Sequence, residues 1–154
     1  MADGAAGRTR RSREALAVAQ HEAAHVVVGV ALGLRLYEAS LLHIPGDRDG
    51  HVIFYEGSRL AMAMMRLAGV VAELRTAPPH GRGDIARASV DKAQARQSLR
   101  GLGRGNYAAA FMAADAILAS RVPIHTAVTR ALLERDLRAA DIAALARGER
   151  VYDF

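Results

Sequence analysis

Residues 18–29 read VAQHEAAHVVVG and decide the fold, because they join an apolar stretch to two regularly spaced histidines. His21 and His25 are four positions apart, so in a helix they lie on the same face. The apolar residues around them spread to every side of that helix, which predicts that it is largely buried. Ser12 is a suitable N-cap for the helix, and Gly33 is expected to end it.

The rest of the chain is rich in small apolar residues and poor in aromatic ones. Hydrophobic residues make up 51% of the 154 residues and aromatic residues only 5%, which is typical of closely packed helices. Two strand-like segments, 36–44 and 51–55, flank a cluster of turn formers and predict a β-hairpin or small sheet. Further helices are expected at 59–76, 84–99, 107–120 and 124–134, with a short turn at 141–146. The expected class is α+β, mainly α, with the histidine-bearing helix, a small β-hairpin or sheet and a C-terminal helical bundle.

The length fits one domain, which we expect at residues 12–148, between a disordered basic leader at 1–11 and a tail at 149–154. The net charge of +5 comes from an excess of arginine that is scattered over helical segments. We read these arginines as solvated faces and expect no nucleic-acid partner, although an arginine-rich nucleic-acid binder stays an alternative. No apolar stretch reaches the roughly 20 residues of a membrane span. We therefore expect a cytoplasmic protein with no membrane partner.

The spacing of the two histidines gives the clearest indication of chemistry. The chain has no cysteine, so any metal site must use His, Asp or Glu side chains. His21, Glu22 and His25 form an H-E-x-x-H pattern, in which both imidazoles can reach one zinc ion. Glu22 is then placed to take a proton from a zinc-bound water and to pass it to the leaving amine.

A catalytic zinc ion needs a third protein ligand, and the spacing leaves its identity open. A metzincin would have glycine and histidine where this chain has Val28 and Ala31, which excludes that class. His43 and His51 flank the hairpin turn and are expected at the surface. The remaining candidates come from a later helix and from the loop-to-helix junction after it: Glu73, His80 and Asp84.

Four sequence blocks resemble, in the same order, the peptidase domain of the FtsH-type ATP-dependent zinc metalloproteases. Residues 18–29 are similar to that family's H-E-A-G-H, which is followed by an apolar stretch and a glycine. LAGVVAEL at 67–74 resembles the family's L-x-G-G-x-x-A-E helix, and GDIARA at 83–88 resembles its N-D-I-x-x-A segment. The fourth block, similar to the family's C-terminal ending, comprises AIL at 116–118, LLERDL at 132–137 and DI at 141–142.

The resemblance implies a zincin-like fold and a zinc metalloendopeptidase that hydrolyses peptide bonds in unfolded polypeptides or peptides. It implies that His21, His25 and Asp84 bind Zn²⁺ and that Glu22 is the general base. Glu73 would orient a ligand from just outside the metal. The hairpin would include the edge where an extended peptide substrate adds by backbone pairing.

The chain also departs from the family pattern. Ala24 and Gly83 stand where the family has glycine and asparagine, and Val70 stands where it has a polar residue. We expect a stand-alone domain without the family's AAA+ ATPase module and membrane anchor, which would act on unfolded chains or receive substrates from a separate ATPase or adaptor. Relatives form hexameric rings, which makes a homo-oligomer a further expectation. The alternative is an FtsH-peptidase-like binding or regulatory module with little turnover.

Overall fold

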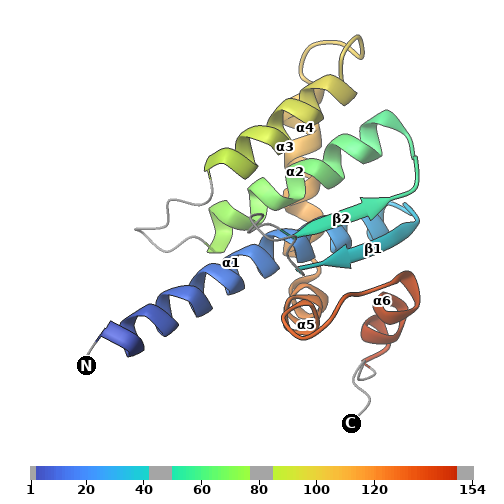
Figure 1. Ribbon diagram of the computed structural model, residues 1–154. Helices are drawn as coiled ribbons and strands as arrows, with labels where there is room; N and C mark the ends of the chain where they lie inside the picture. The colour runs from blue at the N-terminus through green and yellow to red at the C-terminus, as the bar shows by residue number, and fades with distance from the viewer. Residues whose placement is uncertain (1–2, 42–49, 77–84, 149–154) are drawn as a thin grey trace.

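The computed structural model describes residues 3–41, 50–76 and 85–148, and Figure 1 shows their arrangement around one long helix. This helix, α1 (Asp3–Ala31), is followed by strands β1 (Leu36–Ser40) and β2 (His51–Phe54). Helices α2 (Arg59–Thr76) and α3 (Ile85–Ser98) come next. The chain continues with α4 (Asn106–Ala119), α5 (Val122–Leu132) and α6 (Ala139–Ala146).

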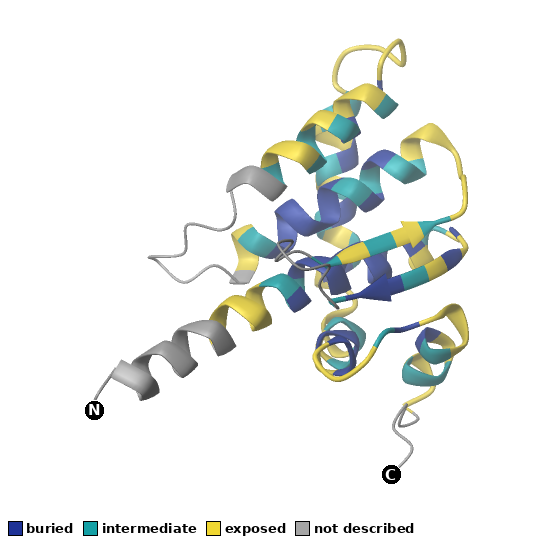
Figure 2. Cartoon of the chain, in the orientation of Figure 1, coloured by how far each residue is buried: buried dark blue, intermediate teal, exposed yellow. Residues whose placement is uncertain are grey.

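The C-terminal half of α1 forms the centre of the domain. Residues 21–29 are all buried, as the sequence pattern predicts (Figure 2). Gly33 has a φ of 78°, a left-handed conformation that glycine adopts without steric cost, and it lies just beyond the end of the helix. Valines are weak helix formers, so packing on both sides stabilises this part of α1.

Helix α2 packs along α1, and α3 and α4 pack against α2. Helix α5 packs against α1 on the side opposite α2 (Figure 1). The main core joins α1, α2, α4, α5 and β1, while a smaller one joins α2, α3 and α4. The smaller core consists mainly of Ala63, Leu67, Ala95, Leu99 and Ala110. Its small side chains let α3 approach α2 closely, and this brings α3 toward the histidines of α1.

The two strands form an antiparallel hairpin that lies against α1. Ala39 of β1 exchanges backbone hydrogen bonds of 2.9 and 2.8 Å with Leu137, which covers the second edge of that strand. Within the described ranges, β2 pairs only with β1. The outer edge of β2 is therefore the side of the sheet on which backbone groups are free of strand partners.

The expected class, mainly α with a small β-hairpin, is confirmed. Helix α2 has the predicted bounds, and α3, α4 and α5 begin and end within two residues of theirs. Helix α6 starts two residues early because the Asp141 carboxylate accepts a hydrogen bond from the backbone N–H of Arg138 at 2.8 Å. Residues 149–154, the expected tail, lie outside the described residues.

Helix α1 begins at Asp3, whereas the sequence analysis placed its N-cap at Ser12 and a disordered leader at 1–11. Alanine and arginine are strong helix formers, and extending an existing helix costs far less than nucleating one.

As for membrane spans, no single described helix has the length and apolarity to cross a bilayer. Among the described residues, one helix pair, α4 and α5, reaches that threshold when taken together, and it is bent by 85° at the break between the two helices.

Candidate metal centre

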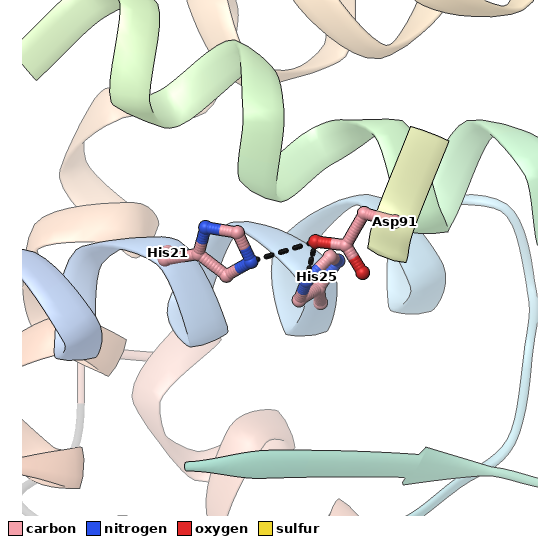
Figure 3. A group of neighbouring side chains, drawn as sticks. All are labelled: His21, His25 and Asp91. Carbon is pink, nitrogen blue, oxygen red and sulfur yellow. Dashed lines mark hydrogen bonds and ion pairs between the residues drawn. The ribbon is translucent and has the colours of Figure 1, made fainter. Parts of the chain in front are cut away.

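Two histidines of α1 and one aspartate of α3 converge inside the domain (Figure 3). Nε2 of His21 lies 2.8 Å from Oδ2 of Asp91, and Nε2 of His25 lies 3.3 Å from the same oxygen. Both histidines are buried, and only 15% of the Asp91 side chain is exposed. The imidazole rings meet edge to face with centroids 4.7 Å apart, as the four-residue spacing on one helix face predicts.

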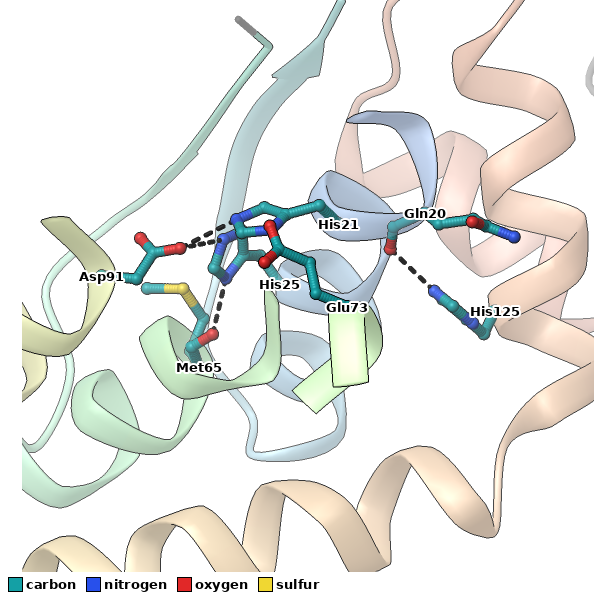
Figure 4. A network of polar contacts seen from close by, with 7 residues as sticks. All are labelled: Gln20, His21, His25, Met65, Glu73, Asp91 and His125. Carbon is teal, nitrogen blue, oxygen red and sulfur yellow. Dashed lines mark hydrogen bonds and ion pairs between the residues drawn. The ribbon is translucent and has the colours of Figure 1, made fainter. Parts of the chain in front are cut away.

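The other ring nitrogen of each histidine has its own acceptor (Figure 4). Nδ1 of His21 lies 2.8 Å from Oε1 of Glu73 on α2. Nδ1 of His25 lies 2.7 Å from the backbone carbonyl of Met65, also on α2. A carbonyl oxygen and a carboxylate oxygen accept hydrogen bonds, so each Nδ1 carries the proton and donates it. In a neutral imidazole, the lone pair is then on Nε2, which faces Asp91.

This arrangement is electrostatically incomplete unless a positive charge occupies the space between the three side chains. A neutral His21 would direct its Nε2 lone pair at a carboxylate oxygen 2.8 Å away, which is repulsive. Either a proton on Nε2 or a metal cation removes that repulsion. Histidines that bind a metal through one nitrogen usually donate the other N–H to a carboxylate or a carbonyl, as both histidines do here.

The pKa values of His21 and Asp91 reflect the short distance between the imidazole and the carboxylate. Burial alone would lower the pKa of His21, but hydrogen bonds with Asp91 and Glu73, together with the charge of Glu22, raise it to about 9. Burial alone would raise the pKa of Asp91, yet hydrogen bonds with His21 and His25 hold it well below its usual range. Without a metal, the site therefore keeps an additional proton on His21 at neutral pH.

The three side chains suit a zinc ion by chemistry and by spacing. Two imidazole nitrogens and one carboxylate oxygen are a donor set that catalytic zinc sites use, and zinc ligands around a tetrahedral ion lie about 3.4 Å apart. The candidate ligand atoms all lie within 4.8 Å of one another. These residues therefore fit a zinc ion.

A glycine of α2 makes room for the histidines. A β-carbon on Gly69 would lie 2.7 Å from Nε2 of His25 and closer still to Nε2 of His21. Any other residue at this position would force the imidazoles to move. On the far side of α1, His125 of α5 donates from Nε2 to the backbone carbonyl of Gln20 at 2.9 Å and so holds the turn that carries His21 (Figure 4).

A cavity of about 440 Å³ opens beside the histidines and Asp91. Glu22, although only 5% exposed, lines this cavity together with them. Its remaining walls come from β2 with the residue before it, from α2 and from α3: Gly50, His51, Val52, Met65, Arg66, Val90 and Gln94. The candidate ligands and the glutamate of the H-E-x-x-H pattern thus face a common space that is large enough for part of a peptide.

Four of the residues that the sequence predicts for the site lie in or next to this cavity. His21, Glu22 and His25 line one cavity, and Glu73 contacts His21. Asp84, the third ligand that the resemblance implies, lies outside the described residues, as do the alternative ligand His80 and His43, which was expected at the surface. His51 is at the surface, as expected, with 48% of its side chain exposed, and it is also one of the residues that line the cavity.

Asp91 was missed by the sequence analysis, although the sequence contains a signal for it. Ala88, Asp91, Ala95 and Leu99 follow one another at spacings of three and four, which places them on one face of α3 and of the turn that directly follows it. Ala95 and Leu99 are buried, so this is the inward face. A single acidic residue on an otherwise apolar inward face needs a buried partner, and here the partners are the two histidines.

Comparison with known proteins identifies no relative of this chain among protein-family models or curated sequences. The resemblance to FtsH-type peptidases therefore rests on the motifs quoted above.

Proposed function

We propose that this protein is a zinc-dependent metallopeptidase that hydrolyses peptide bonds in unfolded polypeptides or short peptides. The observation that carries the proposal is the convergence of Nε2 of His21 and His25 on Oδ2 of Asp91 while both Nδ1 atoms donate to acceptors on α2. This is the hydrogen bonding that metal-binding histidines need. The position of Glu22 on the same cavity adds a candidate proton acceptor.

In this proposal His21, His25 and Asp91 hold the metal, and Glu73 and the Met65 carbonyl fix the two imidazoles. A bound zinc ion supplies Lewis acidity, which lowers the pKa of a water molecule and polarises a carbonyl group. The Glu22 carboxylate accepts a proton from the attacking water and then delivers it to the nitrogen of the leaving amine. The apolar residues around α1 exclude bulk water, which strengthens each of these interactions.

The outer edge of β2 is the proposed place for the substrate backbone. His51 and Val52 of this strand line the cavity, and β1 occupies only the other edge of β2. An extended peptide that pairs with this edge would run past Glu22 and the metal ligands. Folded proteins offer few extended segments, so unfolded chains and peptides are the expected substrates. Their delivery by a separate ATPase or adaptor belongs to the same proposal.

The test combines metal content with cleavage. The full-length protein is purified, its zinc is measured by elemental analysis, and cleavage of an unstructured fluorogenic peptide and of casein is followed. Glu22→Gln should retain zinc and lose activity by about 10²–10⁴-fold, because it removes the proton acceptor but none of the ligands. Glu14→Gln, an exposed change of the same kind on the same helix, should keep both properties.

Two results would reject this proposal. A wild-type protein that takes up no zinc, even after reconstitution, would leave the histidines and Asp91 as an ionic network of the core. A protein that binds zinc but cleaves no faster than Glu22→Gln would instead be the binding or regulatory module that the sequence analysis named as the alternative.

A further inference from the structure

The guanidinium of Arg66 lines the candidate metal cavity, and among the described residues no carboxylate pairs with it. Arg66 of α2 follows Met65, the residue whose carbonyl accepts the hydrogen bond from His25. Its Nη1 donates to Oε1 of Gln94 on α3, an uncharged acceptor that lines the same cavity. Its Nε is buried, and no hydrogen-bond acceptor for it exists among the described residues.

Some exposed arginines of the domain pair with a carboxylate. Arg75 pairs with Asp115 at 2.7 Å, and Arg138 pairs with Glu38 at 3.5 Å. Within the described part of the chain, no carboxylate lies within ion-pair distance of Arg66. A partly buried guanidinium that lacks an anion is unfavourable because it has lost part of its hydration. Binding an anion in the cavity would restore that interaction.

The position of Arg66 relates this anion to the proposed reaction. Its partner Gln94 lies three residues after Asp91 on α3, which is an axial rise of about 4.5 Å. An extended peptide advances about 3.3 Å per residue. A carboxylate bound by Arg66 would therefore belong to a substrate residue within about two positions of the bond next to the metal ligands.

We propose that Arg66, held by Gln94, is a specificity-determining residue that binds a carboxylate of the substrate. The inference rests on the proposed peptidase function and narrows its substrate class. The expected substrates have an acidic residue next to the cleaved bond or have their C-terminus close to that bond. A guanidinium donates two parallel hydrogen bonds to a carboxylate, which an amide cannot match in charge. The carboxylate can come from an Asp or Glu side chain or from the C-terminus of the peptide.

Binding can be measured separately from cleavage. Zinc-loaded Glu22→Gln protein is titrated with four fluorescent peptides of one sequence, which carry Glu or Gln beside the central bond and a free or an amidated C-terminus. We expect at least one carboxylate to tighten binding about tenfold or more. The Glu/Gln pair reports a side-chain carboxylate, and the free/amidated pair reports a C-terminal one.

The same titration is repeated with Arg66 changed. Adding Arg66→Gln should abolish the preference for the carboxylate, whereas Arg66→Lys, which keeps the charge but not the planar fork, should retain part of it. Arg96→Gln removes the same charge from an exposed position on α3 and should leave the preference intact. Zinc content and circular dichroism show whether each variant is folded. If Arg66→Gln does not fold, the comparison of unchanged Arg66 with Arg66→Lys tests the proposal instead.

The outcomes separate the two proposals. A carboxylate preference that survives Arg66→Gln, or one that is absent from the start, overturns the role of Arg66 whether or not the protein cleaves peptides. An Arg66-dependent preference in a protein whose wild type cleaves nothing upholds the carboxylate site and rejects the peptidase. An Arg66-dependent preference in both binding and wild-type cleavage supports both.

Discussion

Gly69 of α2 packs directly against the imidazole of His25, at a distance that leaves no room for a side chain. A β-carbon at this position would lie 2.7 Å from Nε2 of His25. In an ordinary helix, replacing glycine by alanine is favourable by about 0.5–1 kcal/mol. At Gly69 the sign should reverse, because the added methyl group would occupy the space where both histidines meet the candidate metal.

Gly69→Ala is therefore expected to lose zinc and to cost about 1–3 kcal/mol of unfolding free energy. Elemental analysis and urea denaturation measure the two effects. Gly29→Ala is a matched control, because it is also a buried helical glycine whose β-carbon would collide with a ring, that of Phe54. This control should lose stability but keep its zinc. Full zinc content in Gly69→Ala would contradict the proposed geometry.

Asp91→Ala should reduce zinc binding far more than a surface change does, because it removes one of three ligands and leaves two buried imidazoles facing each other. Zinc affinity is measured by competition with a chromogenic chelator. Asp84→Ala tests the ligand that the family resemblance implies. If Asp91→Ala binds zinc normally and Asp84→Ala does not, the third ligand is Asp84 and the convergence at Asp91 is only an ion pair.

Glu73 should act through His21 rather than by touching the metal. Glu73→Ala removes the acceptor of the His21 Nδ1 proton and is expected to weaken zinc binding about 10–100-fold. Glu73→Gln keeps an oxygen acceptor and should have a smaller effect. The exposed Glu134→Ala should leave affinity unchanged. Equal effects of the two Glu73 variants would show that its charge, and not the hydrogen bond alone, is what His21 requires.

The metal-free protein should depend on pH through His21. Its pKa is raised from 6.5 to about 9, so the folded state binds the proton more tightly than the unfolded state. This contribution to stability is fully present below about pH 6.5 and is lost as the pH rises through about 9. Urea denaturation with a chelator present, from pH 6 to pH 10, should show the decline. His21→Gln should remove most of it.

Zinc binding should show the opposite dependence on pH, because the metal and the proton compete for Nε2 of His21. At pH 7, binding should release about one proton per zinc ion, and the apparent affinity should rise with pH up to about 9. Calorimetry in buffers of different ionisation enthalpy measures the released proton directly. Proton release near zero at pH 7 would mean that His21 is already neutral without metal, contrary to the raised pKa.

Much of the fold follows from local sequence patterns. The helices at 59–76 and beyond are recognisable from their apolar periodicity and from the glycines between them, and two strand-like segments predict the hairpin. The shared direction of His21 and His25 also follows from sequence alone, since a four-residue spacing on a helix always places two side chains on one face. The proximity of Glu22 to them is local in the same way.

What only the tertiary structure decided is which groups from other elements meet those histidines. Asp91 reaches them because small residues of α2, α3 and α4 let α3 pack close to α2, and a change in that packing would present a different turn of the helix. The Met65 carbonyl is a backbone group and leaves no trace in the sequence. Helix periodicity determines contacts within one turn, whereas contacts between helices depend on how all their side chains pack together.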